Sequence, residues 1–184
     1  MLCISPALNG QVLRETYHDQ EGKFLKETYY VTDTLSNILD GPYRSYYLNG
    51  QIESHGQFEN NETIGTWEFF FENGIIKMRG NVHRNSNDGY WEYFYESGKK
   101  LMEGEVRDRQ RTGEWVFYFE NGQVKETGSY TANKREGSWK SYYEDGDLLG
   151  TVMYTRNKGR LTEYFPNGRK KAAGPVIGSH KQGE

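Results

Sequence analysis

The sequence predicts an all-β protein, built as an elongated, twisted antiparallel meander of β-hairpin repeats. The first observation is a Gly-x-Trp motif that recurs every 24 residues, at Gly65, Gly89, Gly113 and Gly137. The second is a turn dipeptide such as Asn73-Gly74 after each motif. The third is composition: 15% aromatic residues and 22 glycines in 184 residues suit short strands and tight turns.

The 24-residue period divides the chain into three parts. Six hairpins, which start at residues 41, 65, 89, 113, 137 and 159, make up a repeat array over 41–174. Residues 1–40 are expected to contain a degenerate N-terminal hairpin or cap, and 175–184 to form a flexible tail. The Asn-Gly and Asp-Gly dipeptides predict two-residue hairpin turns. The segments between hairpins are too short for crossover helices, so neighbouring hairpins should continue as a meander.

A two-residue turn at Asn73-Gly74 would place Trp67 opposite Gly80 across its hairpin. The same register pairs the next two tryptophans with glycines, whereas Trp139 faces Val152. A large ring can lie over the bare backbone of a strand glycine. We therefore assign a structural role to the tryptophans and to the glycines at these positions: Trp67, Trp91, Trp115, Trp139, Gly80, Gly104 and Gly128.

Alternation along each strand gives the sheet two faces, one of which carries the tryptophans. The second face carries the aromatic residue three positions after each Trp, often opposite a lysine: Phe70/Lys77, Tyr118/Lys125 and Tyr164/Lys171. A lysine stem can cover such a ring while its ammonium stays in water. Lysine is missing from this place where Phe94 is expected to face Leu101 and Tyr142 to face Leu149.

This gap in the lysines predicts an exposed apolar strip, and such strips usually contact a partner. Its members are Phe94, Leu101, Val116, Tyr118, Tyr142 and Leu149. One alternative is that another segment of the chain covers the strip. The other is that the Trp face stays open, so that the four tryptophans are the contact residues.

No residue pattern indicates a catalytic or metal site. The four histidines fall at unrelated repeat positions, and the single cysteine, Cys3, excludes an internal disulfide framework. Glutamates recur before the turns, at Glu72, Glu96, Glu120 and Glu144, which is typical of solvated turn residues, with calcium or a basic partner as the alternative. The net charge of −3 argues against a general nucleic-acid binder.

The pattern G-x-W-x-x-Y/F-Y/F-x-N-G over 41–174 resembles MORN repeats, and most closely the bacterial variant found in YwqK-type antitoxins. The resemblance implies a β-meander with no catalysis and no cofactor. It also implies a protein partner, which for YwqK-like members is a toxin. Other MORN proteins are implicated in contacts with acidic membrane lipids.

We therefore expect a non-catalytic protein-binding module, of which a toxin-occluding antitoxin or immunity protein is the most specific form. A membrane scaffold that binds acidic lipids through basic loops (107–111, 134–135 and 169–171) is the alternative. An enzyme would need a pocket with converging ionisable groups. A cytoplasmic location is expected, or an exported form if a leader with Cys3 as a lipidation site is processed. Open edge strands allow a monomer or an edge-paired dimer.

Overall fold

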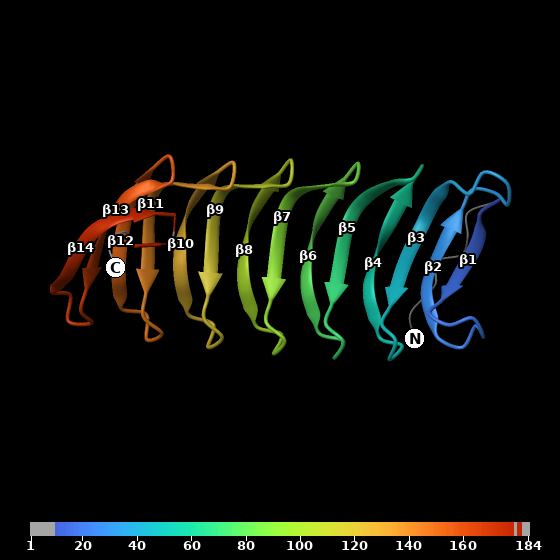
Figure 1. The fold of residues 1–184 in the computed structure, drawn as a ribbon, viewed down its shortest axis with the longest axis horizontal. Helices are drawn as coiled ribbons and strands as arrows, with labels where there is room; N and C mark the ends of the chain where they lie inside the picture. Colours follow the sequence, from blue (N-terminus) through green and yellow to red (C-terminus); the bar gives the residue numbers. More distant parts are fainter. Residues whose placement is uncertain (1–9, 179, 182–184) are drawn as a thin grey trace. The chain divides into compact units, whose positions relative to one another are not determined.

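The computed structural model describes residues 10–178 and 180–181, so Cys3 lies outside the described residues. The chain divides into two compact units, residues 1–87 and 88–184, and each is described on its own. The described residues of both are strands and turns, as the sequence predicts (Figure 1).

Unit 1 is a run of strands in which each one pairs antiparallel with the next (Figure 1). The β1–β2 hairpin lies within the region expected to hold the degenerate cap. The strands are β1 (Val12–Tyr17), β2 (Leu25–Val31), β3 (Leu39–Tyr46), β4 (Ile52–Glu59), β5 (Glu62–Phe70) and β6 (Ile76–His83).

Unit 2 has the same antiparallel order. Its first strand, β7 (Ser86–Phe94), begins just before the boundary between the units. The others are β8 (Lys100–Arg107), β9 (Gln110–Tyr118), β10 (Val124–Thr131), β11 (Lys134–Tyr142), β12 (Leu148–Thr155), β13 (Lys158–Tyr164), β14 (Lys170–Ile177) and β15 (His180–Lys181).

The turns at Asn-Gly are three-residue loops, and the prediction of two-residue turns there was wrong. Phe71 N–H donates to Ile75 O at 2.8 Å, and Gly74 N–H donates to Phe71 O at 2.9 Å. Only Gly74 has a positive φ, while Asn73 accepts the N–H of Ile75 with its side chain. This is a type I turn followed by a glycine bulge. The extra loop residue shifts the register, so that Phe70 pairs with Ile76 rather than Lys77.

The two-residue turns lie instead between the repeats. Both central residues of each have positive φ, the signature of a type I′ turn: Asn60-Asn61, Arg84-Asn85, Asp108-Arg109, Ala132-Asn133 and Arg156-Asn157. The Asn133 side chain accepts the N–H of Arg111 at 2.8 Å, and Asn157 accepts that of Arg135 at 3.2 Å. These asparagines tie their turns to the preceding repeat.

The tryptophans form the core, but their rings lie over a different glycine from the one predicted. Trp115 is in register with Gly128 on β10, as the sequence indicated, and also with Gly104 on β8. Its indole lies over Gly104, and its N–H donates to Glu105 O at 3.1 Å and Thr112 O at 3.2 Å. These bonds direct the ring toward the preceding hairpin.

The same arrangement recurs with Trp67 over Gly56 and Trp139 over Gly128. Trp139 faces Val152, as expected. A bulge accompanies each ring, as between Gly104 and Glu105, close to Gly113 with its φ of +62°. We call the side that carries the tryptophans the Trp face and the opposite side the second face.

Candidate functional site

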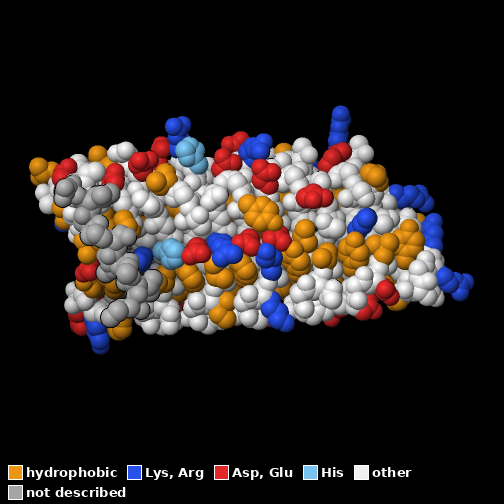
Figure 2. All heavy atoms as spheres, turned by 180° about the vertical axis from the view of Figure 1, so that it is seen from behind, with side chains coloured by type: hydrophobic (Ala, Val, Ile, Leu, Met, Phe, Trp, Pro, Cys, Tyr) orange, Lys and Arg blue, Asp and Glu red, His pale blue; other side chains and the backbone are white. Residues whose placement is uncertain are grey.

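The residues expected to form the partner-binding strip lie in unit 2. Alternation from Trp91, Trp115 and Trp139 places four of them on the second face: Phe94, Val116, Tyr118 and Tyr142. Figure 2 shows hydrophobic side chains interspersed with charged ones on the face seen from behind.

The predicted pairs within this strip were wrong by one residue. Phe94 pairs with Lys100 rather than Leu101, and Tyr142 pairs with Leu148 rather than Leu149. The three-residue loops cause the shift, because each is accompanied by a bulge on the second strand. The register shifts just before the aromatic residue, between Tyr93 and Phe94 and between Ser141 and Tyr142. Leu101 and Leu149 are half-buried residues at these bulges.

The structure brings Val116 and Tyr142 together in a shallow hollow of about 310 Å³. Val124 and Thr127 on β10 lie between them, since Thr127 pairs with Val116 and Val124 pairs with Tyr118. The lining residues are Val116, Gln123, Val124, Thr127, Tyr142 and Gly146. A concave, largely apolar surface of this kind suits a side chain of another molecule.

Sequence reasoning missed Val124 because it assumed the wrong loop length. In a three-residue loop, the second residue after the turn glycine pairs with the aromatic residue that ends the first strand. Val124 and Leu148 occupy this place, as Lys100 does after the preceding turn. The spacing from the turn glycine would therefore have identified Val124 if a three-residue loop had been assumed.

A charged cluster borders the hollow across β7, β8 and β9. Lys100 Nζ lies 2.6 Å from Glu103 Oε2 and 2.8 Å from Glu92 Oε1, and Tyr118 donates to Glu103 at 2.5 Å. Burial raises the pKa of Glu103, but hydrogen bonds from Lys100, Tyr118 and Tyr90 outweigh burial and lower it. Burial opposes the charge of Lys100, but its bonds to Glu103 and Glu92 raise its pKa. The cluster is a stable polar rim.

The lysines lie over different rings from those predicted. Lys77 Nζ is 5.7 Å from the centre of the Phe71 ring, and Lys125 Nζ is 5.5 Å from that of Phe119. Lys171 lies 5.9 Å from Phe165 in the same way. The register shift leaves each of these lysines at a bulge, where it pairs with no residue of the first strand, so the expected pairings with Phe70, Tyr118 and Tyr164 were wrong.

The tryptophans of the Trp face are too deeply buried to contact a partner. The exposed fraction is 7% for Trp67 and 1% for each of Trp91, Trp115 and Trp139. Neighbouring rings enclose them, as where Tyr130 meets Trp139 edge to face at 5.0 Å. Any contact on this face must therefore come from the residues around them.

The charged loops are partly neutralised within the chain. Arg135 is buried against Glu126, and Arg107 donates to Glu105 at 2.9 Å. The repeated glutamates, Glu72, Glu96, Glu120 and Glu144, are exposed at the three-residue turns. Within residues 10–178 and 180–181, no group of three His, Cys, Asp or Glu residues could hold a metal ion. None of these residues belongs to a helix that could cross a lipid bilayer.

Comparison with known proteins identifies the repeat. The family model described as "MORN repeat variant" matches residues 39–60, 64–83, 87–108, 111–132 and 135–155. Each match covers one hairpin, from the strand before a three-residue loop to the strand after it. The search among curated proteins found no match.

A comparison with solved structures found two weak matches. One is the Tc holotoxin pore of Photorhabdus luminescens with the TccC3-D651A mutation, at 10% identity and a TM-score of 0.26. The other is TcdB2-TccC3-TEV, at 9% identity and a TM-score of 0.28. Each similarity covers 92% of this chain and 12% of the other chain. The chain spans about an eighth of the length of the two chains that it matches.

Proposed function

Because the chain belongs to the MORN repeat variant family, we propose that it is a protein-binding module that docks its partner on the second face of unit 2. Repeats of this family are generally protein- or lipid-binding modules, and the fold is typically non-catalytic. The observation that carries the proposal is the hollow between Val116 and Tyr142.

The composition of this surface supports a protein partner. An apolar side chain in the hollow would bury Val116 and Val124, while Lys100, Glu92 and Glu103 would form a polar rim. Apolar pockets with polar borders are the usual anatomy of protein interfaces. Aromatic residues such as Tyr142 contribute strongly to binding at such places.

The finer proposal is that the partner is a toxin and that docking occludes its active surface. What supports this is the similarity of the repeat to that of YwqK-type antitoxins. Occlusion needs no chemistry from the chain and only a surface that matches the partner in shape and charge.

A lipid partner is the alternative, and the position of the basic segments favours a protein. A membrane surface attracts lysines and arginines that lie on one side of a protein. Residues 107–111 and 134–135 lie at the type I′ turns, whereas 169–171 follow a three-residue turn at the opposite ends of the strands. Arg135 is also buried.

Site-specific photo-crosslinking tests the proposal. A benzophenone amino acid at Tyr142 should crosslink the partner in cells, whereas the same group at Phe165, an exposed ring at a turn, should not. Equal crosslinking from both positions, or none from Tyr142, would contradict docking at the hollow. The captured protein is then expressed alone and with this chain. If the captured protein arrests growth when expressed alone and co-expression of this chain restores growth, the antitoxin role is supported. If the captured protein does not affect growth, the antitoxin role is ruled out.

A further inference from the structure

Arg111, on the Trp face of unit 2, holds its guanidinium against buried rings without an acidic partner. Its Cζ lies 4.4 Å from the centre of the Tyr130 ring and 5.6 Å from that of Trp115. Nη1 donates to the Tyr130 hydroxyl at 3.3 Å. Within the described part of the chain, Arg111 forms no ion pair. A guanidinium offers five N–H donors, so most of its capacity remains available.

The next repeat shows what such an arginine binds. Arg135 stands 24 residues after Arg111 and lies in the same way over an indole, 3.8 Å from the centre of the Trp139 ring. Its two terminal nitrogens bind both oxygens of Glu126, at 2.5 and 2.6 Å. Such a fork-to-fork pair is the preferred geometry between arginine and a carboxylate.

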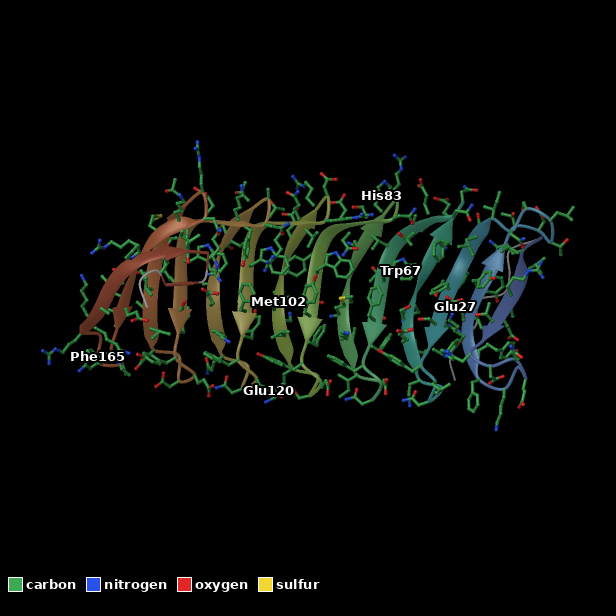
Figure 3. All side chains as sticks on the ribbon, viewed as in Figure 1. Glu27, Trp67, His83, Met102, Glu120 and Phe165 are labelled. Atoms are coloured by element: carbon green, nitrogen blue, oxygen red, sulfur yellow. The ribbon has the colours of Figure 1, made fainter. Side chains whose placement is uncertain are left out.

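The preceding repeat lacks this carboxylate. The residue 24 positions before Glu126 is Met102 on β8, which Figure 3 labels. Met102 pairs with Tyr93 on β7 and with Phe117 on β9. Arg111 and Met102 are each 24 residues before the members of the Arg135–Glu126 pair, so the repeat places Arg111 beside Met102. Burial raises the pKa of the nearby Tyr93 hydroxyl, and the positive charge of Arg111 opposes this rise.

We propose that Arg111 is a binding site for the carboxylate of an Asp or Glu side chain from a partner protein, seated above Met102 as Glu126 is seated beside Arg135. The geometry favours a carboxylate because the chain itself uses one at the equivalent place. Arg111 is only half-buried, so it can stay hydrated while the site is empty. The site is on the opposite face from the hollow and does not depend on it.

Titration of the Arg111 Nε–Hε resonance in NMR spectra of the full chain tests the site. The probe is the capped peptide Gly-Glu-Gly, with Gly-Gln-Gly as its neutral match and inorganic phosphate as the competing anion. The Glu peptide should shift the resonance in a saturable way, and the affinity of the Gln peptide should be lower by a factor of about ten or more. Absence of a saturable shift, equal affinity for both peptides, or tighter binding of phosphate would overturn the proposal.

Two variants locate the site. Met102→Glu supplies the missing carboxylate from within the chain, so it should abolish peptide binding and raise the melting temperature. Arg111→Met should also abolish peptide binding, detected by isothermal titration, while Arg107→Met at the exposed end of β8 should not. Circular dichroism checks that each variant is folded. Peptide binding that survives in either Met102→Glu or Arg111→Met contradicts the assignment, whereas Val116→Asp should leave it unchanged.

Discussion

The indole of Trp115 lies directly over the backbone of Gly104 on the neighbouring strand. A β-carbon added to that glycine would be 2.3 Å from Trp115 Cδ2. No side chain can occupy this space without moving the ring. A hairpin therefore needs glycine at this place wherever the next hairpin supplies a tryptophan, as at Gly56, Gly104 and Gly128.

Gly104→Ala should destabilise unit 2 by about 3 kcal/mol, since overpacking a well-filled core forces rings and backbone apart. Urea unfolding measures the change. Gly174→Ala is the matched control, because Gly174 faces Leu161 as Gly104 faces Trp91, yet an added β-carbon meets nothing within 4 Å. The control should change stability by less than about 0.5 kcal/mol. Similar effects of both substitutions would refute the role assigned to Trp115.

Glu126→Gln should cost about 3 kcal/mol, because it leaves the Arg135 guanidinium buried without its counter-charge. The side chains of Arg135 and Glu126 are 10% and 22% exposed. Glu105→Gln removes the partner of Arg107 in a solvent-exposed pair and should cost about 0–1 kcal/mol. Chemical denaturation compares the two variants. A Glu126→Gln cost no larger than that of Glu105→Gln would show that the buried pair is not needed.

Glu103→Gln should destabilise the protein by about 1–3 kcal/mol at neutral pH through lost charge-assisted hydrogen bonds. The pKa of Glu103 is lowered in the fold, so its contribution is present above pH 4.5, the usual value, and is lost as pH falls through the lowered pKa. The pKa of Lys100 is raised, so the pair also weakens only well above pH 10.5.

The pH dependence is measured as the difference in unfolding free energy between wild type and Glu103→Gln. The difference should shrink as the pH is lowered from 6 to about 3. Glu114→Gln, at an exposed position on the same face, should show little difference at any pH. A Glu103→Gln difference that grows in acid would mean that the cluster does not favour the carboxylate.

Ala132→Asn should raise stability by about 0.5–1 kcal/mol. Ala132 has a φ of +48° in its type I′ turn, a conformation that costs alanine energy and that asparagine adopts readily. Thermal melting detects the gain. Ala172→Asn, in β14 and without a positive φ, serves as the control and should bring no gain. A lower melting temperature for Ala132→Asn would contradict the turn assignment.

The period of Gly-x-Trp was enough to predict the fold class, the antiparallel order within each unit and the register between Trp115 and Gly128. Strand pairing follows from repeated turns, and these are local signals. The turn type could not be chosen in this way. Asn73-Gly74 suits both a two-residue turn and the end of a three-residue loop, and the hydrogen bond from Ile75 to the Asn73 side chain favours the latter.

The candidate site shows how far such an error extends. Phe94 and Val116 were placed on the second face correctly because alternation is insensitive to loop length. Their cross-strand neighbours were predicted incorrectly because the assumed loops were one residue too short, so Val124 and Lys100 were overlooked. The direction of the Trp115 ring also could not be predicted from the sequence. Glycines lie beside it on both neighbouring strands, and the carbonyl oxygens that accept the indole N–H determine which glycine the ring covers.

The most direct test of docking at the hollow uses the partner that crosslinking identifies. Its affinity is measured for two variants of this chain. Val116→Asp places a charge in the hollow, while Thr162→Asp places one at the equivalent repeat position, on the same face but outside the hollow. Val116→Asp should raise Kd about 30-fold or more, and Thr162→Asp should change it less than about threefold. Equal loss of affinity in both, or none in Val116→Asp, would contradict the proposed binding surface.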